Sequence, residues 1–161
     1  MRLRLLVTEK CNRRCEGCCN KDWNLSALEK CKIFKGYDQI ILTGGEPLLK
    51  PFNTLAIINR IKEQTNVPII VYTAKAGKDL DILLNFIDGV TLTLHDQPDV
   101  RVFYQFLERI ENRYQDKSLR LNIFKGIEYD ENLIPPYWKI QSDMVWIKNC
   151  PLPDGEVFMR Y

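Results

Sequence analysis

The sequence predicts an α/β fold whose parallel sheet forms either an open, partial barrel or a doubly wound layer. Short apolar runs alternate along the chain with amphipathic helical segments, a pattern typical of right-handed βαβ units. The chain has 161 residues, of which 45% are hydrophobic, enough for one domain with a buried core. Six predicted strands are too few for a closed eight-stranded barrel, so the sheet is expected to stay open.

Each predicted strand is a short run rich in aliphatic residues. The run before Gly44 and Gly45 has the composition of a fully buried strand. The six strands are expected at residues 2–7, 39–43, 68–72, 90–95, 119–124 and 144–147. Residues 149–161 contain two prolines and a glycine and are expected to be irregular.

About four helices are predicted between these strands, from apolar residues spaced three and four apart. They are expected at residues 25–34, 53–64, 78–87 and 99–114. Asn53 is the expected cap of the second helix. In parallel α/β folds the functional site lies at the carboxyl ends of the strands. Cys11, Gly44, Thr73, His95 and Lys125 each follow a predicted strand, so we expect them to gather at this edge.

The charge balance gives no sign of an attraction to nucleic acid or to membranes. The chain carries 23 basic and 21 acidic residues, a net charge of +2. Its first apolar run is too short for a signal peptide, and no run approaches the roughly 20 apolar residues that span a bilayer. We therefore expect a cytoplasmic protein with reduced thiols, in which clustered cysteines bind metal or carry out redox chemistry.

Four of the six cysteines lie in the stretch CNRRCEGCC, residues 11–19. Cys11, Cys15 and Cys18 have the spacing C-x3-C-x2-C on a loop after the first strand. The spacing alone favours a [4Fe–4S] cluster that keeps one iron free. A zinc site with a fourth ligand from Cys19, Cys31, Cys150 or His95 is an alternative, as are a thiol–disulfide pair and inert cysteines.

A second motif, LTGGEPLL, closes the next predicted strand. Gly44 and Gly45 would let a ligand approach the backbone, and the Glu46 carboxylate suits an ammonium group. A tight turn between strand and helix would also explain the two glycines. The two motifs together, in this order after the first two strands, are the more specific signal.

With both motifs in place, the chain resembles the radical S-adenosylmethionine (SAM) superfamily. TEKCN, residues 8–12, is similar to that superfamily's usual entry to the cysteine loop. The resemblance covers residues 2–148 and implies an open, partial (β/α)6 barrel of parallel strands that forms one domain over residues 1–161. It also implies an active site at the carboxyl ends of the strands.

The resemblance implies two cofactors, a [4Fe–4S] cluster and SAM. Cys11, Cys15 and Cys18 would hold the cluster, and Gly44, Gly45 and Glu46 would meet the methionine amino group of SAM. Reductive cleavage of SAM would give a 5′-deoxyadenosyl radical that takes a hydrogen atom from a substrate. The candidates for contacts with ribose and adenine are Thr73, Thr93, His95, Asn122 and Phe124. A flavodoxin- or ferredoxin-type electron donor is the implied partner.

Two departures from the superfamily lie in the second half of the cysteine stretch. Gly17 stands where an aromatic residue is usual, so Trp23 or a side chain from a later strand is expected to cover the adenine instead. Cys19 is expected to be a bystander, because a fourth thiolate would close the open iron site. Cys31 is expected in the core and Cys150 as a small apolar filler.

The substrate class is left open by the sequence. CEGCCN, residues 15–20, is similar to activases of glycyl-radical enzymes, which favours a protein or peptide substrate. Short members that act on small molecules or nucleotides, such as 7-carboxy-7-deazaguanine synthases, are the alternative. A non-catalytic iron–sulfur or zinc protein is the alternative from another class. The radical must be shielded from solvent, so either a large partner or residues 149–161, folded as a lid, is expected to cover the opening.

Overall fold

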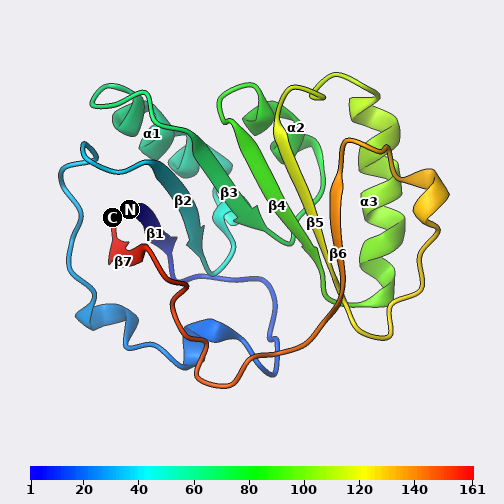
Figure 1. Cartoon of the computed structure of the whole chain (residues 1–161), viewed down its shortest axis with the longest axis horizontal. Coiled ribbons are helices and arrows are strands. Elements are labelled where there is room, and N and C mark those ends of the chain that lie inside the picture. The colour runs from blue at the N-terminus through cyan, green and yellow to red at the C-terminus, as the bar shows by residue number, and fades with distance from the viewer.

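The computed structural model describes residues 1–161, and its centre is one seven-stranded sheet in which all neighbouring strands are parallel (Figure 1). The strands are β1 Arg2–Thr8, β2 Gln39–Gly44, β3 Ile69–Thr73, β4 Gly89–Leu94, β5 Ser118–Phe124, β6 Lys139–Met144 and β7 Glu156–Arg160. Their order is β6-β5-β4-β3-β2-β1-β7. The sheet does not close, because β6 and β7 are its two edge strands and do not pair with each other, and it is compatible with a partial barrel.

Three α-helices pack against one face of this sheet. They are α1 Pro51–Lys62, α2 Lys78–Leu84 and α3 Gln97–Ile110. The face is built from alternate strand residues, such as Leu3 and Leu5 of β1 and Leu121 and Ile123 of β5, which share one core with the buried helix residues. None of these helices combines the length and the apolar composition that crossing a membrane requires.

The opposite face of the sheet carries no helix, and we call it the inner face. The intervening strand residues point to it, and many are polar or charged, among them Arg2 and Arg4 of β1 and Asn122 of β5. Glu156 of β7 stands opposite Arg2 in the register, and its side chain, only 2% exposed, pairs with both Arg2 and Arg4. The inner face is therefore the polar side of the molecule.

The first five strands confirm the sequence prediction to within one residue at either end. Three of the predicted helices are also present, shifted or shortened at their ends. The prediction that Asn53 caps α1 is wrong, because Lys50 holds the capping position and makes no side-chain cap. Instead, Asp96 and Asp99 form a reciprocal capping box at the start of α3.

The helix predicted at residues 25–34 is not formed. Only a single 3-10 turn, Leu25–Ala27, is helical, and the chain then runs extended beside β7. The amide of Cys31 donates to the carbonyl of Arg160, and the amide of Arg160 donates to the carbonyl of Glu29. Cys31 is nevertheless buried, as expected, although in an extended segment.

The end of the chain differs most from the prediction. The sixth strand is β6, which overlaps the predicted residues 144–147 only at Met144, and its polar composition follows from its place at an exposed edge. The expected irregular region, residues 149–161, contains β7, which pairs with β1 along its whole length.

Residues 145–155 join the two free edges of the sheet, and we call them the crossing segment. In Figure 1 this segment leaves the carboxyl end of β6, passes the loop that follows β1, and returns to begin β7 beside the amino end of β1. The carboxyl ends of the parallel strands thus meet on one edge, with the loop after β1 and the crossing segment beside them.

Candidate functional site

The three cysteines of the C-x3-C-x2-C motif lie on the loop that follows β1, and all three are free thiols. Lys21 holds this loop, because its Nζ donates to the carbonyl oxygens of Cys15 and Glu16 at 2.7 and 3.1 Å. Cys11 is exposed, while Cys15 and Cys18 are half-buried. Burial raises the pKa of the Cys15 thiol, and the neighbouring Cys18 acts in the same direction.

Cys19, next to this triad, forms a disulfide with Cys150 of the crossing segment. Their Cα atoms lie 5.3 Å apart, although 131 positions separate them in sequence. The expectation of reduced thiols is therefore wrong for this pair, as is the expectation that Cys150 is an apolar filler, while the expectation that Cys19 is not a cluster ligand stays a prediction. The disulfide joins the cysteine loop to the crossing segment. Because these segments are distant in sequence, no local sequence pattern predicts the pairing.

The donor set offered by the loop fits a cluster bound by three thiolates. Cys19 and Cys150 are bonded to each other, and Cys31 is buried in the core, so no other cysteine is free to act as a fourth ligand. No group of three or more His, Cys, Asp or Glu side chains converges closely enough to hold a metal ion in this structure. The loop thus supplies three free thiols, which would have to turn towards one point to bind a cluster.

The disulfide gives a prediction about stability. Reducing it with a thiol reagent is expected to lower the free energy of unfolding by about 2–4 kcal/mol, because the cross-link restricts the unfolded chain. Urea unfolding with and without the reductant measures the difference. A Cys19→Ser, Cys150→Ser double variant should start from the lower value and not respond to the reductant. If the wild type is equally insensitive, the cross-link does not form.

Gly44 and Gly45 pack against the entry to the cysteine loop. A Cβ atom built on Gly44 would lie 2.1 Å from the carbonyl oxygen of Thr8, and one on Gly45 would lie 2.1 Å from that of Lys10. The amide of Gly45 donates to Thr8 O at 2.7 Å, and the amide of Glu46 donates to Lys10 O at 2.8 Å. The glycines therefore allow the two motifs to touch, which is a different use from the close ligand approach that the sequence suggested.

Glu46 is buried and is surrounded by hydrogen-bond donors of the chain. Its Oε1 accepts from the amide of Leu48 at 2.9 Å and from the hydroxyl of Thr73 at 2.6 Å, and its Oε2 accepts from the amide of Ala74 at 3.0 Å. The structure thus brings together the predicted site residues Glu46 and Thr73. With an exposed fraction of only 2%, Glu46 joins the end of β2 to the end of β3 and offers little surface to a ligand.

Arg13 ties the cysteine loop to the start of α3. Its guanidinium pairs with Asp99, and at 3.4 Å with Asp96. The Asp99 carboxylate also accepts from the amides of His95 and Asp96, at 2.8 and 3.3 Å. Arg13 and Asp99 were not among the predicted site residues. The arginine's place between Cys11 and Cys15 is the only sequence signal that could have identified it.

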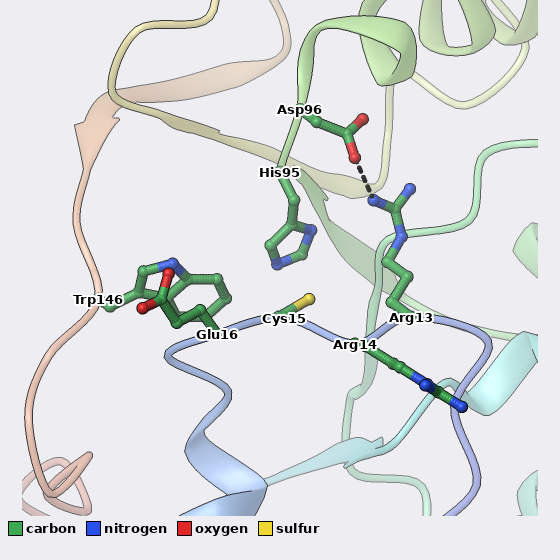
Figure 2. Close-up of a pocket in the computed structure, with 7 residues that line it drawn as sticks. All are labelled: Arg13, Arg14, Cys15, Glu16, His95, Asp96 and Trp146. Carbon is green, nitrogen blue, oxygen red and sulfur yellow. Dashed lines mark hydrogen bonds and ion pairs between the residues drawn. The ribbon is translucent and has the colours of Figure 1, made fainter.

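A cavity of about 370 Å³ opens between this loop, the end of β4 and the crossing segment. Figure 2 shows Cys15 and the side chains of His95 and Trp146 at this cavity, with Arg13 reaching towards Asp96. Most of its lining residues are polar or charged. The thiol of Cys15, the imidazole of His95 and the indole of Trp146 also line it. The predicted residues Cys15 and His95 thus share one cavity.

His95, Phe124 and Trp146 form a cluster of three rings, in which the centroids of Phe124 and Trp146 lie 4.4 Å apart. His95 stacks on Phe124, with ring centroids 5.0 Å apart, and on Trp146, with centroids 5.5 Å apart. Burial lowers the pKa of His95 below its ordinary value, and the positive charge of Arg13 acts in the same direction. Its Nδ1 atom is buried without a hydrogen-bond partner. A neutral imidazole with a free polar atom beside a cavity is suited to a ligand contact.

Trp146 occupies the space above Gly17. A Cβ atom on Gly17 would lie 2.3 Å from Cγ of Trp146, so this position has room only for glycine. Trp23 lies elsewhere, with its ring against Phe158 and its Nε1 donating to Cys150 O at 3.1 Å. Trp23 therefore lies away from Gly17, and the aromatic ring beside Gly17 is that of Trp146 in the crossing segment.

The contact between Gly17 and Trp146 can be tested by a double-mutant cycle. Gly17→Ala is expected to displace the indole and to cost about 1–3 kcal/mol of stability, as overpacking does elsewhere. In a Trp146→Ala background the same substitution should cost almost nothing. Urea unfolding gives the energies, and near-ultraviolet circular dichroism reports the aromatic packing. Equal costs in both backgrounds would mean that the two residues do not touch.

Thr93 and Asn122 are neighbours in the register of β4 and β5. Both are half-buried and face the inner side of the sheet, and neither side chain forms a hydrogen bond within the chain. They lie two residues before His95 and Phe124 on the same strands and the same face. The structure therefore places Thr93, His95, Asn122 and Phe124 on one continuous surface, while Thr73 belongs to the Glu46 network on the opposite face.

No family model matches the chain. Among curated proteins, a GTP 3',8-cyclase of Clostridium perfringens is 26% identical over an alignment of 187 positions. The match covers 97% of this chain and 57% of the relative, so the chain spans a little over half of that protein's length. At superfamily level, the match supports the radical SAM resemblance of the sequence.

Proposed function

We propose that this chain is a radical SAM enzyme that uses a [4Fe–4S] cluster held by Cys11, Cys15 and Cys18. The observation that carries the proposal is the division of the loop's four cysteines into three free thiols and one that is bonded to Cys150. When bound, the cluster and SAM would supply the radical chemistry that removes a hydrogen atom from a substrate. Three ligands leave one iron open for SAM, whereas a structural zinc site needs four.

The chain's own residues would position SAM at the cavity beside Cys15. The rings of Trp146, His95 and Phe124 offer flat surfaces to a planar base. His95 Nδ1, buried without a partner, offers a hydrogen bond. Asp96 at the same cavity carries a carboxylate that suits hydroxyl or ammonium groups. Glu46, Gly44 and Gly45 would act by holding the cysteine loop against the ends of β2 and β3.

The substrate favoured here is a small molecule, in contrast to the protein substrate that the similarity of residues 15–20 suggested. The crossing segment lies beside the carboxyl ends of the strands and supplies Trp146 to the wall of the cavity. It can thereby shield the opening without a large partner. The match to a GTP 3',8-cyclase also points towards nucleotide chemistry. An activase-like role, with a glycyl-radical enzyme as partner, is the second candidate and depends only on CEGCCN.

The proposal is tested by reconstituting the protein anaerobically with iron and sulfide, reducing it, and adding SAM. We expect a brown protein that releases 5′-deoxyadenosine, measured by liquid chromatography and mass spectrometry. A colourless protein with bound zinc would support the non-catalytic alternative. A brown protein that binds SAM but releases no 5′-deoxyadenosine under reduction would refute the enzymatic proposal.

A further inference from the structure

A second cavity, of about 230 Å³, lies on the inner face of the sheet. Its floor comes from β1, β2 and β7, and its roof from residues 147–153 of the crossing segment. Cys19, Asn20 and Trp23 of the chain after β1 close its side. The cysteine loop therefore contributes to two cavities, with residues 13–16 at the first and Cys19 and Asn20 at the second.

The second cavity has an aromatic wall. Trp23 and Phe158 meet edge to face, with ring centroids 5.2 Å apart. The Nε1 of Trp23 donates to Cys150 O, which fixes the ring and satisfies its polar atom. What these side chains offer to a ligand is consequently apolar ring surface, which suits a flat, unsaturated molecule.

Three polar side chains at this cavity keep unused hydrogen-bonding groups. Asn20 and Thr43 line it, and neither side chain bonds to another group of the chain. Arg4 uses Nε and Nη2 for Glu156, at 2.8 and 2.7 Å, which leaves Nη1 free. Glu156 pairs with both Arg4 and Arg2, so it offsets only part of their positive charge, and the free Nη1 of Arg4 can donate to a carbonyl oxygen of a ligand.

These features point to a heterocyclic base. An amide side chain pairs with a donor and an acceptor on one edge of a base, an arginine N–H donates to a ring carbonyl, and aromatic side chains provide stacking surfaces. The volume lies below the 300–1,000 Å³ of typical ligand pockets. It can admit a base while the rest of a nucleotide extends outside.

We propose that this second cavity is the substrate site and that it binds the base of a nucleoside or nucleotide through Arg4, Asn20 and Thr43. The inference rests on the proposed radical SAM function, because it assigns the first cavity to SAM and the second to the molecule that loses the hydrogen atom. The second cavity touches the cysteine loop at Cys19, the residue that follows the proposed cluster ligand Cys18.

The test measures equilibrium binding of GTP and guanosine to the reconstituted protein by isothermal titration calorimetry, with SAM at saturation so that its site is filled. Inorganic triphosphate is the probe that lacks a base. We expect GTP and guanosine to bind and triphosphate to bind at least about tenfold more weakly, since triphosphate can make neither base-stacking nor base-edge contacts. Equal binding of GTP and triphosphate would overturn the proposal. So would a failure of both GTP and guanosine to bind.

Variants locate the binding. Asn20→Ala and Thr43→Val are each expected to weaken guanosine binding about tenfold. Asn24→Ala is the matched control, because Asn24 follows in the same segment but its side chain accepts from Ser26 outside the cavity. Undiminished guanosine binding in both cavity variants would place the nucleoside elsewhere. Binding that follows these expectations without release of 5′-deoxyadenosine would refute the radical function and leave the base site standing.

Discussion

Replacing Cys15 with alanine is expected to yield a colourless protein that releases no 5′-deoxyadenosine. Two thiolates cannot retain a [4Fe–4S] cluster that normally takes three or four cysteines. Cys11→Ala and Cys18→Ala should behave in the same way, because each removes one of the three free thiols of the loop. Iron and sulfide content, the visible absorption spectrum, and the 5′-deoxyadenosine yield are the measurements.

The chain offers two controls for this experiment. Cys31→Ala removes a buried thiol that lies outside the loop, so iron content should be unchanged even if stability falls. Cys19→Ala should keep the iron while losing the bond to the crossing segment. The ligand assignment is wrong if Cys19→Ala loses the iron and Cys11→Ala keeps it.

Gly45→Ala is expected to destabilise the protein by at least about 4 kcal/mol and to prevent cluster uptake. The new Cβ would lie 2.1 Å from the carbonyl oxygen of Lys10 and 2.8 Å from that of Glu9. Both are backbone atoms, so the clash can be relieved only by moving the cysteine loop away from β2. Effects of this size arise from a few causes, of which overpacking against a fixed backbone is one.

Gly77→Ala is the matched control for Gly45→Ala. A Cβ on Gly77 meets nothing within 4 Å, and its φ of 174° is extended backbone that any residue adopts. Urea unfolding and iron content should therefore remain close to the wild type. If Gly45→Ala unfolds at the same urea concentration as Gly77→Ala, the contact between the two motifs is not as close as the structure has it.

Most of the sheet could be predicted from the sequence because its signals are local. The strands from β1 to β5 are apolar runs followed by turns, and the C-x3-C-x2-C loop lies wholly within eight neighbouring positions. Parallel topology then places Cys11, Gly44 and His95 at one edge, as expected. These parts depend on composition and spacing, which a single sequence contains.

The parts that escaped prediction depend on contacts between distant residues. Nothing near Cys150 indicates a partner at Cys19, and nothing near Trp146 indicates that it fills the space left by Gly17. The segment at residues 25–34 has apolar residues at plausible helical spacing, but pairing with β7 holds it extended. In each case the deciding partner comes from the last part of the chain, whose own pattern is weak.

The pairing of β7 with β1 also has a consequence for how the protein is made. During synthesis β1 emerges early, and its outer edge remains without a partner until Glu156–Arg160 has left the ribosome. An unpaired strand edge readily recruits other chains. The nascent chain therefore exposes this unpaired edge beside its cysteine loop until residues 156–160 have been made, and chaperone binding in this interval should favour correct maturation.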